Sequence, residues 1–380
     1  MKTFAKISRS FAVASIALAA SVASFGAVKA QDCPFADDSA IFYYSPSTIA
    51  DDGSIAAIWR TEEFGKLFGE ATDKIDAELG EKLAEAKDKD DFPREKFDYL
   101  NDLLSRELGA SPNASNLIQA YFKYVDGVAF SFVAPTAGEK KPQAAALTWI
   151  LGFNPAGLDL AKLCGDDLEV VKNEGGVYMA KLTLKKDGKS ETVYLGGVKI
   201  KDLDKYAVVL ADSQATLETK LTRFQASNAF VVKRLNDESV YAETILKTTL
   251  FERAAVELAK DEKNEKAQTI KGFVEKVKSL RVKKSDVDGT FVATVELEAI
   301  DAKAAKEFKD LAVGGVALLN LATAKKELKS EEKFALELIR SVEFNVNEEA
   351  GVATATLKIE ADKIMAIAGW VGEKIEEKTK

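Results

Sequence analysis

The feature that most constrains the fold is a recurring order of a helix, a strand, a tight turn, a second strand and another helix. In one copy, an apolar helix through Phe273 leads into a strand at 280–282, an Asp288-Gly289 turn and a return strand at 291–297. Asp-Gly is preferred in two-residue hairpin turns. Strands joined so tightly run antiparallel, because parallel neighbours need a long crossover connection. We therefore expect an α+β fold, with antiparallel sheets built from repeated helix-strand-strand-helix units and covered by helices.

Two further copies of this unit flank the first. One contains the alternating strand Val128, Phe130, Phe132 and a return strand from Ala144; the other pairs strands near 342–346 and 353–359. In the third copy, Phe344 and Val346 should share a face with Val342, and Leu357 and Ile359 should face helices.

The rest of the mature chain adds a strand meander and more amphipathic helices. Four strands are expected between 168 and 211, and helices with one apolar face are expected at 64–83 and 97–108. The polar segment 225–228 is the best domain boundary. We predict a signal peptide at 1–30, an N-terminal α+β domain at 31–225 and a C-terminal α+β domain at 226–380.

The first 30 residues have the pattern of an export signal. Lys2, Lys6 and Arg9 precede an apolar run that starts at Phe11, and Ala30 occupies the −1 place of a cleavage site. We expect an exported bacterial protein, periplasmic or extracellular, that starts near residue 31.

The chain has two cysteines, Cys33 and Cys164. An even count in an oxidising compartment predicts one intramolecular disulfide between them. The alternative is two buried thiols.

Histidine is absent from the whole chain, and the net charge is −8. The first fact excludes Ser-His-Asp triads and histidine-based metal centres. The second argues against nucleic acid, which needs a basic surface. The longest later apolar run, Leu311 to Ala324, is shorter than the roughly 20 residues of a membrane-spanning helix. We interpret it as a buried helix and expect no transmembrane span.

Two motif matches have simpler structural interpretations. Ser330 and Lys333 fit a Ser-x-x-Lys pattern, but the partner motifs of that enzyme class are missing. Asp286, Asp288 and Gly289 resemble half of a calcium loop, but the closing position falls on Val295, which has no side-chain oxygen. We interpret the first as a helix start and the second as a hairpin turn, and we expect neither a metal nor a cofactor.

One aromatic-rich stretch leaves two interpretations open. Core packing is the first, and a groove for a ligand is the second. The stretch contains Tyr121, Phe122, Tyr124, Phe130 and Phe132.

Three segments carry a resemblance to a protein family. They are 38–67, with its Asp38-Ser39-Ala40-Ile41-Phe42-Tyr43-Tyr44 opening, the strand pair 128–153, and the run 206–217. In these segments the chain resembles a family of uncharacterised exported bacterial proteins, a domain of unknown function common in planctomycete-like bacteria. The resemblance implies export and a similar order of elements. It brings no activity, cofactor or site residue.

These observations predict a non-enzymatic exported protein with a binding or assembly role in the envelope. Its partner would be an envelope component or an apolar ligand. The alternative is a carboxylate-dependent hydrolase acting on an envelope polymer, because paired carboxylates can perform acid–base chemistry without histidine.

Overall fold

A computed structural model describes residues 34–46, 123–136, 139, 141–155, 167–186, 189–236, 239–260, 264–324, 330–360 and 362–364, with 66, 69–70, 73–74 and 76–77. The export signal, Cys33 and Cys164 lie outside these residues, as do most of the two helices expected before residue 110. Export, the disulfide and the division into 31–225 and 226–380 therefore remain predictions.

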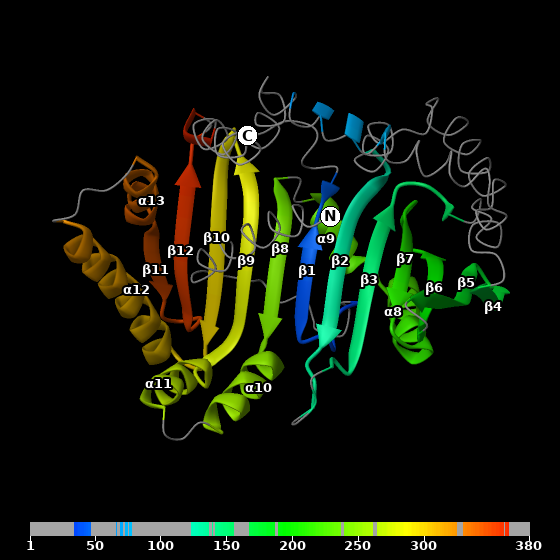
Figure 1. The fold of residues 1–380 in the computed structure, drawn as a ribbon, viewed down its shortest axis with the longest axis horizontal. Helices are drawn as coiled ribbons and strands as arrows, with labels where there is room; N and C mark the ends of the chain where they lie inside the picture. Colours follow the sequence, from blue (N-terminus) through cyan, green and yellow to red (C-terminus); the bar gives the residue numbers. More distant parts are fainter. Residues whose placement is uncertain are drawn as a thin grey trace.

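The described strands form one antiparallel sheet of 12 strands (Figure 1). Its order is β11-β12-β10-β9-β8-β1-β2-β3-β7-β6-β5-β4. The bounds are β1 Ala40–Tyr44, β2 Val125–Val133, β3 Ala144–Leu151, β4 Leu168–Glu174, β5 Val177–Lys186, β6 Lys189–Lys199, β7 Tyr206–Ala211, β8 Val240–Lys247, β9 Val277–Val287, β10 Thr290–Ala299, β11 Glu343–Asn347 and β12 Val352–Ile359.

This single sheet corrects the expected fold class. We predicted an α+β fold of separate antiparallel sheets made of helix-strand-strand-helix units, and the structure joins the hairpins edge to edge instead. The reason is β1, which pairs with β2 through Phe42 and Phe130 and with β8 through Phe42 and Thr244. A short strand with a partner on each edge links the two groups of hairpins. The meander β4–β7 then extends the sheet with no helix between its strands.

Six helices of the described residues pack against the sheet or one another. Their bounds are α8 Gln214–Ala226, α9 Ala229–Asn236, α10 Thr248–Ala259, α11 Glu265–Val274, α12 Ala302–Thr323 and α13 Ser330–Arg340.

Helices α8 and α9 cover what we call the back face, the side of the sheet that carries Ile41 and Tyr43. Leu217, Leu221 and Phe224 of α8 are buried there. A Cβ placed on Gly196 of β6 would lie 2.8 Å from Leu221 Cδ1, so glycine permits this close approach of helix and strand.

Helices α12 and α13 cover the opposite side, the front face, at the β10–β12 end. Ala304, Ala305 and Phe308 of α12 pack on Leu297 and Ala353. Leu338 of α13 packs on Leu357 and Ile359. The two groups of helices therefore lie on opposite faces of one sheet.

Local signals explain several element ends. Ser213 and Asp301 cap α8 and α12, each accepting a hydrogen bond from a backbone N–H three residues on. Asp288 and Gly289 have φ of 52° and 76°, the left-handed pair that a two-residue hairpin turn needs.

The third hairpin confirms its predicted faces. Phe344 and Val346 occupy alternate positions of β11, and Phe344 packs with Val342 against Val295 and Ala355. Leu357 and Ile359 are buried on the same side of β12.

The expectation of a buried helix at 311–324 is wrong. This stretch is the second half of α12, where Leu318 is 68% exposed and Leu321 74%. Among the described residues, no helix is both long and apolar enough to cross a membrane.

Candidate functional site: an apolar sheet face

A row of apolar side chains crosses the front face from one edge of the sheet to the other. Residues directly opposite one another on neighbouring strands point to the same face. All members of the row except Thr244 are apolar. In sheet order they are Phe344, Ala355, Val295, Val282, Thr244, Phe42, Phe130, Leu147, Leu210, Leu195, Ala180 and Val170.

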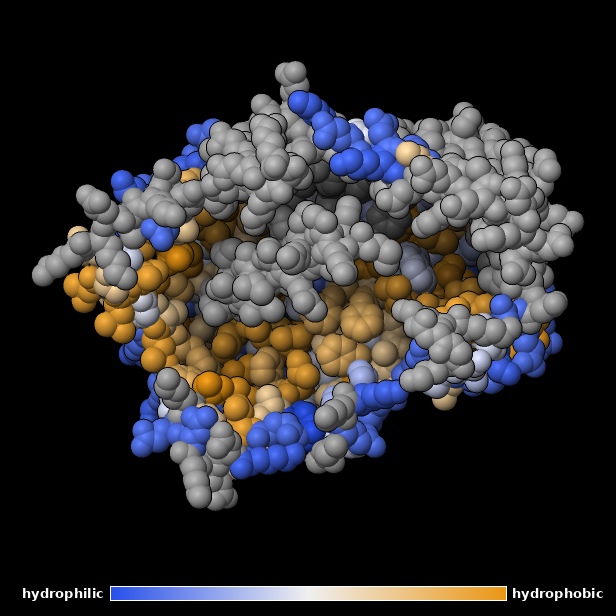
Figure 2. All heavy atoms as spheres, viewed as in Figure 1, coloured by the Kyte–Doolittle hydropathy of each residue, from blue (hydrophilic) through white to orange (hydrophobic). Residues whose placement is uncertain are grey.

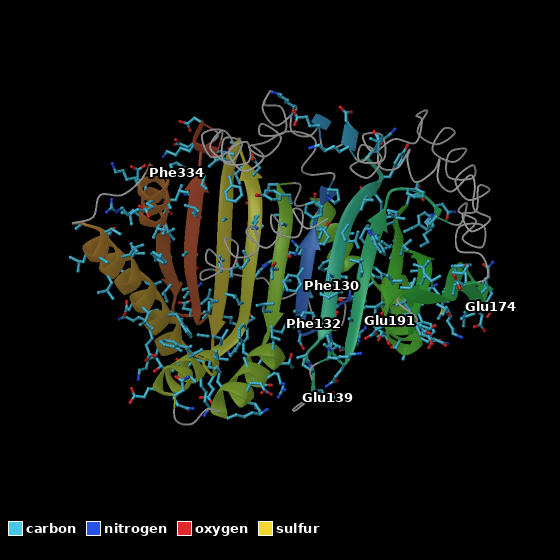
Figure 3. All side chains as sticks on the ribbon, in the orientation of Figure 1. Phe130, Phe132, Glu139, Glu174, Glu191 and Phe334 are labelled. Atoms are coloured by element: carbon cyan, nitrogen blue, oxygen red, sulfur yellow. The ribbon has the colours of Figure 1, made fainter. Side chains whose placement is uncertain are left out.

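Three phenylalanines at the middle of this face form what we call the phenylalanine cluster: Phe42 of β1 and Phe130 and Phe132 of β2. The ring of Phe42 stacks at 6.2 Å on Phe130 and at 6.4 Å on Phe132. Phe42 is 41% exposed and Phe130 42%. Figure 3 shows Phe130 and Phe132 beside each other on β2.

The exposure of this cluster follows from where the helices pack. The central strands bury Ile41, Tyr43 and Ala129 on the back face, so the alternation places Phe42 and Phe130 on the front. Figure 2 shows apolar residues gathered over the central strands in a hollowed surface whose lower margin is polar. An exposed apolar surface of this kind usually marks a binding site.

The expected core role of the aromatic stretch is therefore wrong for Phe130. Phe132 is half-buried. The ring of Tyr124 packs edge-to-face on the ring of Phe153, outside the cluster, with the ring centroids 5.7 Å apart. Tyr121 and Phe122 lie outside the described residues. The exposure of Phe42 and Phe130 leaves the ligand-groove interpretation open.

Lys284 of β9 brings positive charge onto the same face. It lies opposite Ala242 and Ala293, in the row next to that of Phe42. Burial lowers the pKa of its ammonium, because desolvation disfavours the charged form. The sequence analysis did not predict that a lysine lies on this apolar face.

A second concave feature lies between α10 and α11. It is a cleft of about 430 Å³ lined by Ala255, Val256, Val274 and Ile300, within the usual size range of ligand sites. Its charged residues pair nearby, Lys271 with Glu275 at 3.5 Å and Lys278 with Glu298 at 3.8 Å.

The strongest ionic cluster lies on the back face, under α9. Glu243 of β8 pairs with Arg234 of α9 and Arg281 of β9, and Arg281 also contacts Glu296 of β10 at 3.1 Å. The side chains of Glu243 and Glu296 are 0% and 11% exposed. Burial raises the pKa of Glu296 to about 7, against the opposing effect of Arg281.

The hydrolase alternative requires two neighbouring carboxyl groups, and among the described residues Glu243 and Glu296 form such a pair. Arginines enclose them beneath a helix, so a polymer chain has no access to Glu243. A hydrolase of the expected kind would need its carboxylates in an open cleft. The arrangement is that of a buried ion network that fixes α9 to the sheet.

Asp37 and Asp38 hold the N-terminal segment in place. Asp38 is buried and pairs with Lys220, and Asp37 pairs with Arg223, both on α8. Lys247 Nζ donates to the carbonyl oxygens of Phe35 and Ala36 at 2.7 and 2.8 Å. These contacts fix the approach of the chain to β1.

The two motif matches are structural elements. Ser330 begins α13. Asp286 accepts a hydrogen bond from the Gly289 N–H at 3.0 Å within the β9–β10 turn. Among the described residues, no group of three or more acidic or cysteine side chains could hold a metal ion.

Comparisons with known proteins identify no family. No family model matches the chain, and no curated protein matches it. Among solved structures the chain is similar to TP0453. Crystal form I gives a TM-score of 0.36 at 8% identity, covering 92% of this chain and 100% of that chain. Crystal form III gives 0.35 at 8% identity, with 87% and 94% covered.

Proposed function

We propose that this protein is an exported binding protein that holds an acyl chain with an anionic head group on its front face. The observation that carries the proposal is the exposed phenylalanine cluster within a row of apolar side chains. A non-enzymatic role of this kind uses the sheet as a rigid floor and needs neither histidine nor a metal.

The chain-like form of the ligand follows from the shape of the surface. The apolar row runs across strands that are about 4.8 Å apart, so a flexible chain can contact Phe42, Phe130 and Leu147 in succession. Burying one such phenylalanine contributes roughly 1.5–3 kcal/mol.

The head group is inferred from Lys284. Its strand β9 lies two strand spacings from β1, roughly 10 Å away. Along the strand direction, Lys284 is displaced by two residues from the row that contains Phe42. A chain lying on the phenylalanine cluster can therefore place a carboxylate or a phosphate near this ammonium.

Fluorescence of Trp149 provides a direct test, because its indole lies on the front face opposite Val128 and Val208. The test protein is the mature chain with Trp59→Phe and Trp370→Phe, which leaves Trp149 as the one tryptophan of three. Brominated stearic acid should quench Trp149 saturably. Phe42→Ser with Phe130→Ser should weaken this binding by about tenfold or more, given the burial energies above.

Matched controls separate the site from general stability. Val287→Ser removes an exposed apolar side chain from the back face of β9 and should leave binding unchanged. Lys284→Met should weaken binding of the brominated acid but not of the corresponding brominated alcohol. Equal quenching in the double serine variant, with its circular dichroism intact, would refute the site.

A further inference from the structure

Helix α12 changes character along its length. In its first half, Ala304 and Ala305 are buried against the sheet. In its second half no charged residue occurs between Leu311 and Ala324, and Leu311 is 52% exposed, Leu318 68% and Leu321 74%. Figure 2 shows apolar residues at this edge of the molecule too. The outer side of the helix is thus apolar without being packed.

One stripe of this outer side alternates large and small residues. Leu311, Gly315, Leu318 and Ala322 are spaced four, three and four residues apart, so they share one helix face. All four are exposed.

Nothing among the described residues requires a glycine at position 315 of this stripe. A Cβ placed on Gly315 would meet no atom within 4 Å, and its φ is not in the left-handed region. Glycine weakens a helix interior relative to alanine. A residue that weakens the helix and relieves no internal contact is explained if another surface approaches there.

We infer that this stripe is the contact face of a homodimer in which α12 packs antiparallel on α12 of a second copy. A two-fold axis midway between Gly315 and Leu318 places each Leu318 opposite the partner's Gly315. The same axis places each Leu311 opposite the partner's Ala322. Every leucine then faces a small residue, as a self-complementary two-fold interface requires.

This large–small complementarity favours a second copy over a lipid surface. Fluid acyl chains adapt to any apolar surface and do not require small residues opposite the leucines. The uncharged stretch of 14 residues is also only about 21 Å long at 1.5 Å per residue, shorter than the roughly 30 Å bilayer core. Association with a membrane is the competing outcome of the test.

The test measures the molar mass of the full mature chain by sedimentation equilibrium over a range of concentrations, without reductant, and non-reducing electrophoresis excludes disulfide-linked dimers. The wild-type chain should show a reversible monomer–dimer equilibrium. Gly315→Leu, which places leucine opposite leucine, should raise the dissociation constant about tenfold or more. Adding Leu318→Ala should restore dimerisation, because the large and small residues have then exchanged places.

Gly315→Ala separates dimerisation from helix stability. It should raise the melting temperature of dilute protein, because the new methyl group enters open space in the monomer, and yet weaken the dimer. The matched control is Gly272→Ala in α11, which also has open space around its Cβ and should leave the dissociation constant unchanged.

Three results would overturn the inference. They are a monomer at every concentration, a dimer that tolerates Gly315→Leu, and a size exchange that fails to restore the dimer. Binding to phosphatidylcholine vesicles that Leu318→Glu abolishes, without any self-association, would assign the face to a membrane instead.

Discussion

The carboxyl group of Glu296 has a pKa above its ordinary value in the folded protein. Burial raises its pKa to about 7 from 4.5, although Arg281 opposes the shift. The folded state therefore keeps a proton that the unfolded state loses between pH 4.5 and 7. It follows that this group lowers the free energy of unfolding as pH rises through that window. A shift of this size corresponds to about 3 kcal/mol, which partial exposure to solvent reduces to roughly 2 kcal/mol.

The measurement is urea unfolding of wild type and Glu296→Gln across pH 4.5 to 7 and above. The glutamine variant cannot titrate at position 296. The free energy of unfolding of wild type, minus that of the variant, should therefore fall as pH rises to about 7 and then become constant. Parallel curves for the two proteins would show that Glu296 is not held protonated.

Lys284 should make ligand binding depend on pH at the alkaline side. Burial lowers the pKa of this ammonium, so its charge is lost at a lower pH than that of an exposed lysine. The affinity for brominated stearic acid should fall as pH rises through the lowered pKa, while the affinity for the uncharged alcohol stays constant. The Trp149 titration measures both, and a fall shared by the alcohol would exclude Lys284 as the cause.

At the scale of elements, the N-cap of α12 is a local determinant that can be tested alone. Asp301 Oδ1 accepts a hydrogen bond from the Ala304 N–H at 2.7 Å. Asp301→Ala should lower the free energy of unfolding by about 1 kcal/mol, and Asp301→Asn should lower it much less, because asparagine also caps well. Chemical denaturation of the two variants provides the comparison, and equal losses would mean that the cap bond is unimportant.

Turns and caps were predictable because their signals are local. Asp288-Gly289 and Asp301 show their roles within four residues of sequence. Strand β8 was not predicted, because Glu243 occupies one of its buried positions. The ion pairs of Glu243 with Arg234 and Arg281 make that burial tolerable, and they join residues that are distant in sequence.

The site was less predictable than the hairpins. Alternation in β2 shows that Val128, Phe130 and Phe132 share a face, but it does not show which face the helices cover. That depends on α8 and α9 packing on the other side, which is a property of the complete sheet.

On the scale of the whole molecule, β1 joins the two halves of the sheet. It hydrogen-bonds to β2 on one edge and to β8 on the other. We therefore expect the strands before residue 225 and those after it to unfold together. Differential scanning calorimetry should show one transition whose van't Hoff and calorimetric enthalpies agree. Two resolved transitions would instead support independent domains at 31–225 and 226–380.

The central place of β1 also has a consequence for synthesis and folding. Ala40 pairs with Leu246, so one edge of β1 stays unpaired until a segment about 200 residues downstream has been synthesised. Closing so long a loop is slow. A nascent or truncated chain that ends before Val240 would leave that edge of β1 open. Unpaired strand edges can pair with other chains, so such fragments should aggregate. The pairing of β8 with β1 therefore determines when the central edge of the sheet is no longer exposed to other copies of the chain.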